Sequence, residues 1–414
     1  MALHVLLDVL LGLSWLVALN WVWRVADALR KLPGVPNLLD AHYDRVEEGA
    51  GDSGSAALAK VCVIVPACNE AASIADTLRS LLASEGVDIE IIAVNDRSTD
   101  ATGTIMDTVA ASTRNLGHKL RVLHITELPP GWLGKPHAMA LAARQTSAEW
   151  LLFTDGDVIY APDALRRSLR LAAEQRADHL VLYPTLILEL FGERLIMCCV
   201  QVLAVWAVRP WKIADPGARK DSAGVGAFNL VRREVYFAVG GYEALRMEVL
   251  DDVRLGYKIK QEGYRQRVAF GRGLIRIRWA IGAGGVMRNL TKNAFAVFGY
   301  RVPVLLWACC GLMFLSLMPF AGPLFVAHST PMRAGLLGWA PGSIELAALW
   351  ALARYYQRHS GIPSGYVLTF PVGVCLTVLA MLRSMIVTLR LGGVPWRGTI
   401  YPLTELRKKV GPVR

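Results

Sequence analysis

Four long apolar stretches constrain this chain more than any other feature. A helix needs roughly 20 residues to cross a hydrocarbon core about 30 Å thick. Stretches of about that length run over Leu3–Trp23, Val302–Ala327, Ala334–Ala353 and Ile362–Leu382. The first lacks the small-residue cleavage site of a signal peptide, so we expect it to remain as an anchor. The sequence therefore predicts a chain that is partly folded in a bilayer and carries a separate water-exposed domain.

The charge distribution indicates how the chain is oriented. The net charge is +11, and basic residues follow apolar segments, as in "RVADALRK" and the terminal "LRKKVGPVR". This is typical of cytoplasmic membrane flanks, and the absence of a basic arm interleaved with aromatic residues argues against nucleic acid as a partner. Three later passes would leave the basic tail outside. We therefore expect a cytoplasmic tail, with one later segment re-entrant or interfacial. The seven cysteines contain no CxxC pair, and we expect buried thiols in a reducing compartment.

From about Lys60 the pattern changes to short β-branched runs that alternate with amphipathic helices. "KVCVIVPA", "IEIIAVND", "LRVLHI" and "EWLLFTD" are typical of strands, and the segments between them are typical of helices. Alternation of this kind predicts right-handed βαβ units and an α/β fold, a mostly parallel sheet with helices on both faces.

Polar residues cluster where these strands end. Asn69 and Glu70 follow the first strand, Asp96 ends the second, and Asp155 and Asp157 follow the fourth. Ligands of parallel sheets bind at the carboxyl ends of the strands. Two carboxylates that follow an apolar strand fit a hard divalent cation, since Mg²⁺ uses one or two carboxylates together with substrate phosphates. The alternative interpretation of "DGD" is an ordinary surface turn.

In order and spacing, several motifs resemble those of family 2 inverting glycosyltransferases. The motifs are "VIVPACNEAASIADTLRSLL", "AVNDRSTDAT", "GKPHAMALA", "FTDGDV", "GVGAFNLVRREVYFAVGGYEAL" and "LDDVRLGYKIKQEGYR". With the membrane flanks and the terminal "GGVPWRGTIYPL", the chain is most similar to membrane-bound members that act on lipids, such as hopanoid-associated, carotenoid and ceramide glycosyltransferases. The resemblance implies a nucleotide-diphospho-sugar transferase fold of the Rossmann-like GT-A type.

The resemblance also implies a donor site. Asp155 and Asp157 would hold Mg²⁺ or Mn²⁺ on the diphosphate of a nucleotide sugar, with a UDP-sugar favoured. Asp96 would contact the uracil or ribose, although "NDRSTD" is also rich in helix-capping residues. Pro66 and Glu70 would line the nucleotide bed, where this chain has Cys68 in place of the arginine of most members. Lys135, at a helix start, would approach the diphosphate or else be a solvated lysine.

The second half of the resemblance implies an acceptor site. Asp252 would take the proton of the acceptor hydroxyl, because a hydroxyl becomes a competent nucleophile only as its proton leaves. Asp251 would support it, and both aspartates are also good residues for a helix start. Gly226 would lie on the acceptor side. Arg278 and Trp279 resemble the end of a QxxRW motif whose glutamine position is Ile275 here, and the pair could equally anchor the chain at a membrane interface.

These observations predict an anchor (1–30), a linker (31–59), a cytoplasmic glycosyltransferase domain (60–293), a membrane region (294–391) and a basic tail (392–414). The segment "RLIMCCVQVLAVWAVRPWKI" is expected to be an interfacial helix that presents lipid. The predicted function is inverting, metal-assisted transfer of one sugar to a lipid hydroxyl by an integral protein of the inner membrane. The alternatives are a processive polysaccharide synthase and a non-catalytic nucleotide-binding scaffold.

Overall fold

The computed structural model describes residues 2–44, 59–113, 119–326, 334–396 and 399–409, which fall into two compact units. The sheet unit comprises Val35–Ile187, Val208–Trp279 and Trp396–Arg414. The helical unit comprises Met1–Gly34, Leu188–Ala207 and Ala280–Pro395. This division differs from the contiguous domain expected over 60–293, because 188–207 and 280–293 belong with the apolar helices. Most of the predicted linker, 45–58, lies outside the described residues.

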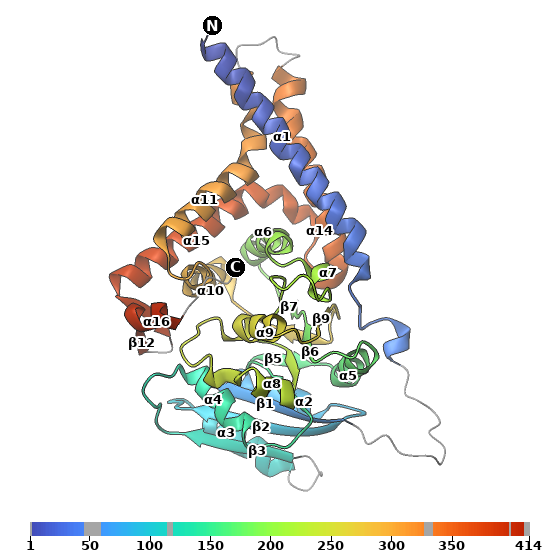
Figure 1. Ribbon diagram of the computed structural model, residues 1–414, viewed down its shortest axis with the longest axis vertical. Coiled ribbons are helices and arrows are strands. Elements are labelled where there is room, and N and C mark those ends of the chain that lie inside the picture. The colour runs from blue at the N-terminus through green and yellow to red at the C-terminus, as the bar shows by residue number, and fades with distance from the viewer. Residues whose placement is uncertain (1, 45–58, 114–118, 327–333, 397–398, 410–414) are drawn as a thin grey trace. The chain divides into compact units, whose positions relative to one another are not determined.

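The sheet unit is built on a seven-stranded sheet in the order β3-β2-β1-β4-β8-β6-β9 (Figure 1). The strands are β1 (Lys60–Ala67), β2 (Asp88–Asp96), β3 (Lys119–Ile125), β4 (Trp150–Phe153), β6 (His179–Leu182), β8 (Asn229–Arg232) and β9 (Gln266–Ala269). β1 to β4 pair in parallel, and β8 is antiparallel to both of its neighbours. The four strands predicted from β-branched runs are therefore β1 to β4, in a mostly parallel sheet.

A second, three-stranded sheet has the order β5-β10-β7. Its strands are β5 (Val158–Tyr160), β7 (Thr185–Leu186) and β10 (Ile275–Ile277). β5 begins directly after Asp157, and β10 ends directly before Arg278. Two of the predicted site segments are therefore attached to one small sheet.

Helices cover both faces of the large sheet and bury β1, β2 and β4 on both sides. One face packs against α2 (Ile74–Leu82), α3 (Thr102–Thr113) and α5 (Ala164–Glu174). The other packs against α4 (Gly134–Ala143), α8 (Arg233–Ala238) and α9 (Asp251–Gln261). Strands buried on both faces read as continuous apolar runs, which is why β1 to β4 could be recognised in the sequence.

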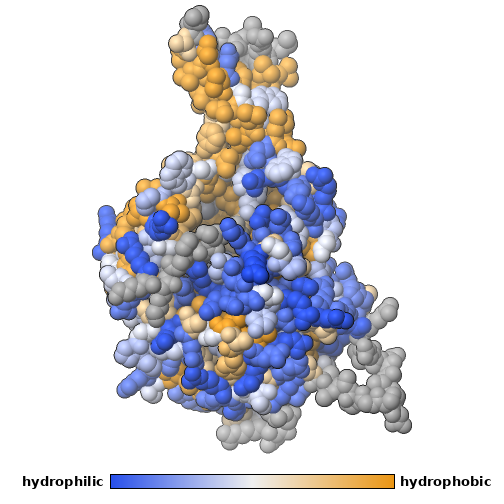
Figure 2. Space-filling view, in the orientation of Figure 1, coloured by the Kyte–Doolittle hydropathy of each residue, from blue (hydrophilic) through white to orange (hydrophobic). Residues whose placement is uncertain are grey.

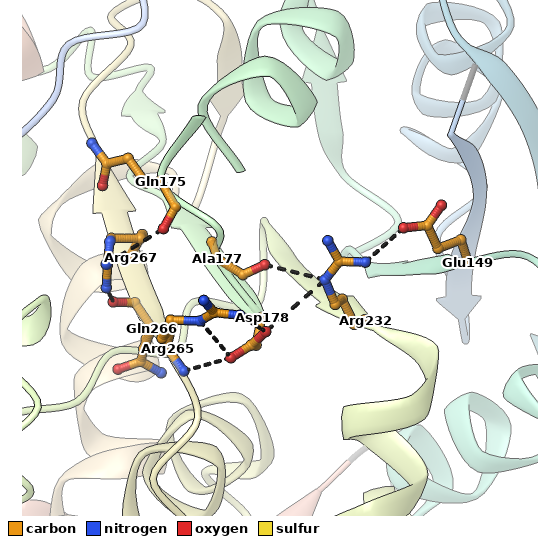
Figure 3. A network of polar contacts seen from close by, with 8 residues as sticks. All are labelled: Glu149, Gln175, Ala177, Asp178, Arg232, Arg265, Gln266 and Arg267. Carbon is orange, nitrogen blue, oxygen red and sulfur yellow. Dashed lines mark hydrogen bonds and ion pairs between the residues drawn. The ribbon is translucent and has the colours of Figure 1, made fainter. Parts of the chain in front are cut away.

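A polar network joins the far strands of the sheet (Figure 3). Asp178, directly before β6, accepts a 2.8 Å hydrogen bond from the backbone N–H of Arg265 and pairs with its guanidinium at 3.3 Å. Arg232 of β8 lies 4.0 Å from the same carboxylate and 2.6 Å from Glu149. These contacts satisfy a buried carboxylate and fix the ends of β6, β8 and β9 against one another.

The helical unit consists of apolar helices. They are α1 (Ala2–Lys31), α6 (Phe191–Ala207), α10 (Gly282–Val297), α11 (Val302–Leu317), α12 (Gly322–Phe325), α14 (Trp339–Ser360) and α15 (Phe370–Arg390). Five helices in the described residues are long and apolar enough to cross a membrane: Ala2–Gly34, Phe191–Ile213, Val302–Phe325, Gly335–Ser360 and Ser364–Arg390. The second of them is the segment expected to be interfacial.

Large apolar side chains of this unit point outward, as the orange surface of Figure 2 shows. Trp307, Leu368 and Leu324 are 80%, 72% and 71% exposed. A water-soluble protein seldom exposes apolar side chains in such numbers, so these helices need an apolar environment. The same faces carry Cys310 and Cys375, which are exposed, contrary to the expectation that the thiols are buried; the other five cysteines are buried.

Candidate active site

The predicted aspartates after β4 lie on a turn that hydrogen bonds from neighbouring elements hold in place. Thr154 donates from its hydroxyl to the carbonyl of Ala227, and the carbonyl of Gly156 accepts hydrogen bonds of 3.0 Å from Ser73 and Thr77 of the α2 region. These contacts hold the turn between β4 and β5, so that Asp155 and Asp157 are placed at the carboxyl end of the sheet.

Lys135, at the start of α4, contacts the first of these carboxylates. Its Nζ lies 2.6 Å from Oδ1 of Asp155 and 3.8 Å from Oδ2 of Asp251. Burial by itself lowers the pKa of Lys135, but Asp155, Asp251 and Asp252 more than reverse this and raise it. The ammonium therefore stays charged and bridges the aspartates predicted for the donor with those predicted for the acceptor.

Gly226 stands at the centre of this arrangement. A Cβ at this position would lie 2.5 Å from Oδ2 of Asp155 and 3.3 Å from Nζ of Lys135. Its backbone N–H also faces the carboxylate of Asp252 and partly opposes the raised pKa of that group. The loop before β8 thus brings together three elements that are far apart in the sequence, and any side chain at Gly226 would separate them.

Asp251 and Asp252 occupy the first turn of α9. The carboxylate of Asp252 accepts a 2.8 Å hydrogen bond from the N–H of Val253, one of the helix-start donors without a partner inside the helix. Burial raises the pKa of Asp251 to about 7, with the negative charges of Asp252 and Asp155 adding to the effect and Lys135 opposing it. Burial also raises the pKa of Asp252. A carboxylate with a raised pKa is a stronger base, which suits the role predicted for Asp252.

Asp157 is crowded by like charges. Burial raises its pKa to about 7, and the negative charges of Asp155 and Glu70 act in the same direction. Crowded carboxylates of this kind favour a bound cation, and oxygen ligands fit Mg²⁺ or Mn²⁺. Within the described ranges no group of three or more His, Cys, Asp or Glu side chains could hold a metal ion. Asp155 and Asp157 could supply the two carboxylates that such an ion takes when phosphates complete its coordination.

The turn after β1 lies beside the turn after β2. Asn69 has a backbone φ of 57°, and its side-chain oxygen accepts a 2.8 Å hydrogen bond from the N–H of Thr99. The N–H of Glu70 donates to the hydroxyl of Thr102 at 2.8 Å. Pro66 and Cys68 are buried on this turn. The predicted nucleotide-bed residues are therefore held against the segment that contains Asp96.

Asp96 is bound by a neighbour that the sequence analysis did not single out. Nε and Nη2 of Arg97 donate to the two carboxylate oxygens of Asp96 at 2.7 and 3.1 Å. The side chain of Asp96 is 5% exposed and that of Arg97 is 28% exposed. The available signal was the position of Arg97 within "NDRSTD", directly after the predicted contact.

Arg278 and Trp279 come near Asp157 through the small sheet. β10 pairs antiparallel with β5, and Ile277 lies opposite Val158. The next residue of β10 is Arg278, and the residue before Val158 is Asp157. Ile275, at the position of the motif glutamine, is fully buried, so it is a core residue here.

Comparisons with known proteins gave one family match and several similar solved structures. Residues 62–187, less than half the chain, match the family model for glycosyl transferase family 2. A comparison with curated protein sequences gave no match.

Similar solved structures include the mannosyltransferase PcManGT from Pyrobaculum calidifontis in complex with GDP-Man and Mn²⁺, which is 18% identical. Its TM-score is 0.48, with 92% of this chain and 99% of that chain covered. TarS 1-349 of S. aureus is 14% identical with a TM-score of 0.39, covering 80% of this chain and 92% of that one. The glucosyl-3-phosphoglycerate synthase of Mycobacterium tuberculosis, in complex with Mn²⁺ and UDP-glucose, is 22% identical. Its TM-score is 0.33, and 51% of this chain and 69% of that one are covered.

The family match defines the class of the sheet unit. Residues 62–187 match the model for glycosyl transferase family 2, and they contain the parallel strands β1 to β4. The protein is therefore a glycosyltransferase. The roles of individual residues, the acceptor and the stereochemistry are treated below as proposals.

Proposed function

We propose that this protein is a membrane-bound, inverting glycosyltransferase that moves one sugar from a nucleotide sugar to a lipid hydroxyl with the help of a divalent cation. The observation that carries the proposal is the convergence of Asp155, Lys135, Gly226 and the Asp251–Asp252 pair at the carboxyl end of the sheet. Lys135 contacts both the donor-side Asp155 and the acceptor-side Asp251, and the missing side chain of Gly226 leaves room for this contact.

Each group has a distinct task in this proposal. Asp155 and Asp157 would hold Mg²⁺ or Mn²⁺, which neutralises charge on the departing diphosphate. Lys135 would exchange part of its contact with Asp155 for a phosphate oxygen. Asp252 would accept the proton of the acceptor hydroxyl, and burial together with the negative charge of Asp155 raises its pKa. With one base and no second nucleophile assigned, a single displacement inverts the anomeric centre.

The lipid acceptor is supported by the exposed apolar helices. α6 leaves the sheet unit after Ile187 and returns to it at Val208, so an apolar helix is inserted into the catalytic half of the chain. Strands on both sides of this insertion, β6 and β8, pair in one sheet. Both ends of α6 therefore lie on one side of the membrane, which fits an interfacial helix that presents lipid better than a crossing helix.

The test of the base and of the metal site is a pair of substitutions. Asp252→Asn keeps the shape of the side chain but removes its ability to take a proton, and general-base catalysis contributes about 10²–10⁴-fold, so kcat should fall by that order. Binding of the nucleotide sugar should change little. Asp157→Asn should weaken Mn²⁺-dependent donor binding as well as turnover.

The measurements are donor isotherms and turnover on lipid extracts, with and without a chelator. UDP-, GDP- and dTDP-sugars should be screened, and mass detection should identify a glycosylated lipid. Full activity in excess chelator would remove the metal assignment. An Asp252→Asn enzyme that turns over normally would remove the base assignment, and a soluble sugar that serves as well as any lipid would remove the lipid acceptor.

A further inference from the structure

The C-terminal segment of the chain contributes a side chain to the predicted nucleoside end of the site. β12 (Thr399–Pro402) and α16 (Leu403–Lys409) follow the last apolar helix and belong to the sheet unit. Tyr401 is 6% exposed, and Leu406 is fully buried. This segment is therefore packed, although it lies more than 300 residues from Asp96 in the sequence.

The phenol of Tyr401 meets two groups beside Asp96. Its hydroxyl lies within interaction range of the guanidinium of Arg97 and of the backbone of Gly134, the first residue of α4. The approach is close, because a Cβ on Gly134 would lie 2.1 Å from Oδ2 of Asp96 and 2.6 Å from Nη2 of Arg97. Asp96, Arg97, Gly134 and Tyr401, here named the Arg97 cluster, thus form one contact group drawn from three distant parts of the chain.

The backbone supplies a second, independent observation. Arg97 has a φ of 56°, in the left-handed region that is unfavourable for any residue other than glycine. A side chain kept in such a conformation is held there by its surroundings, and conformations of this kind cluster at functional sites. The strain places the guanidinium across the carboxylate of Asp96, where Nε and Nη2 are both used.

The chemistry of the Arg97 cluster determines which ligand atoms it can meet. Asp96 is almost completely covered, whereas Arg97 keeps more than a quarter of its side chain exposed. A guanidinium has five N–H donors in a fixed fork and no acceptor. Its remaining donors can therefore meet only acceptors, such as the carbonyl oxygens of a base or the oxygens of a ribose.

We propose that Arg97, held in place by Asp96 and by Tyr401 from the C-terminal segment, is the residue that contacts the nucleoside of the donor. Asp96 then acts through Arg97, and Tyr401 is a positioning residue. This inference rests on the proposed function, since it assigns the nucleoside end of the same donor site. It differs from the contact suggested by the sequence, in which the carboxylate of Asp96 meets the nucleoside directly.

The test compares ligands with and without a nucleoside on the full-length protein. Binding of UDP, GDP, dTDP and inorganic pyrophosphate is measured by calorimetry in the presence of Mn²⁺. The variants are Arg97→Lys, which keeps the charge but loses the fork, and Tyr401→Phe. Tyr183→Phe is the matched control, because the buried hydroxyl of Tyr183 has no hydrogen-bond partner among the described residues.

The wild type should bind its preferred nucleoside diphosphate more tightly than pyrophosphate. Arg97→Lys should raise the Kd for that nucleotide by about tenfold or more, which is the usual effect of losing a hydrogen bond to a charged group. Tyr401→Phe should raise it by about two- to tenfold. Pyrophosphate should bind all variants equally, and Tyr183→Phe should behave as wild type.

Two results would overturn the inference. The first is unchanged nucleotide binding in both variants of a protein that prefers nucleotide to pyrophosphate. The second is an equal loss of pyrophosphate and nucleotide, which would make the Arg97 cluster merely structural. A wild type that binds none of the three nucleotides more tightly than pyrophosphate would instead contradict the proposed function itself.

Discussion

At the scale of single residues, the site depends on a position without a side chain. Gly226 allows Oδ2 of Asp155 and Nζ of Lys135 to approach the loop before β8, and its N–H reaches Asp252. The aspartates and the lysine carry the charge, but the space at Gly226 sets the distances between them. A small change there is expected to act on all of them together.

Gly226→Ala should therefore lower activity strongly. The new Cβ would lie 2.5 Å from the carboxylate of Asp155, so the carboxylate has to shift. A displacement of about 1 Å in an active site typically costs about 10²-fold in rate, and we expect kcat/KM to fall by that order. Gly34→Ala is the control, because nothing lies within 4 Å of a Cβ there. Unchanged activity in Gly226→Ala, with a thermal midpoint equal to that of wild type, would show that the aspartates do not need this approach.

At the scale of secondary-structure elements, one buried network joins the sheet to the acceptor half of the site. The amide nitrogen of Gln266 in β9 donates to Nδ1 of His179 in β6 at 2.7 Å, and it also meets the carbonyls of Ala223 and Gly256. Nε2 of His179 donates to Asn229 of β8 at 3.1 Å. The loop that contains Gly226 and the helix that begins at Asp251 are thus tied to three strands.

This network predicts that the sheet unit loses stability in mild acid. Burial lowers the pKa of His179 from 6.5 to about 4, and the hydrogen bond with Asn229 only partly opposes this. Between pH 6.5 and pH 4, His179 therefore binds a proton in the unfolded chain but not in the folded chain. The contribution of neutral His179 to the free energy of unfolding is fully present above pH 6.5, and it falls by about 3 kcal/mol as the pH drops towards 4.

The measurement is the thermal midpoint between pH 4 and pH 8 for the wild type, His179→Gln and His42→Gln. His179→Gln should flatten the decline below pH 6.5. His42 has a half-exposed side chain and serves as the control, with the slope of the wild type expected. Equal slopes in all three proteins would show that His179 does not cause the acid sensitivity.

At the scale of the whole molecule, the grouping of the segments constrains the membrane topology. The sheet unit contains residues on both sides of α6 and also the tail after α15. A folded unit lies on one side of a membrane, so we expect the chain between Trp279 and Trp396 to cross an even number of times. Three candidate spans occur in that interval, and we expect one of them not to cross.

Packing inside the helical unit indicates which of the three candidate spans does not cross the membrane. Trp21 of α1 donates to the carbonyl of Leu315 in α11 at 2.7 Å, and α14 runs beside α1 in Figure 1. α15 packs mainly against α10, and also against α6 and α11; Ser384 of α15 accepts a 2.9 Å hydrogen bond from the N–H of Phe295 in α10. We therefore expect α1, α11 with α12, and α14 to cross, and α15 to lie at the interface.

Labelling of single cysteines with an impermeant maleimide tests this topology. In a background without the native cysteines, Glu127→Cys, Arg358→Cys and Thr404→Cys should be reached from the same side, and Leu336→Cys from the other side. All of these positions are exposed. Labelling of Thr404→Cys and Glu127→Cys from opposite sides would contradict the even number of crossings.

The sequence by itself determined the class of the fold and the positions of its parts. β1 to β4 and the helices between them could be predicted because strands buried on both faces give continuous apolar runs, a local property. Asp96, Asp155 and Asp157 were predictable for the same reason, since the ends of parallel strands meet at one edge. The apolar segments were visible from their length.

Only the tertiary structure decided which of these residues meet. The ion pair of Lys135 with Asp155, the space at Gly226 and the network around Gln266 join residues 20 to 91 positions apart. No local pattern records such distances, because they follow from how helices and strands pack. The proximity of Arg97 and Tyr401 is likewise visible only in the tertiary structure. So is the place of the C-terminal tail in the sheet unit, from which we expect an even number of membrane crossings, a point that the charge pattern had left open.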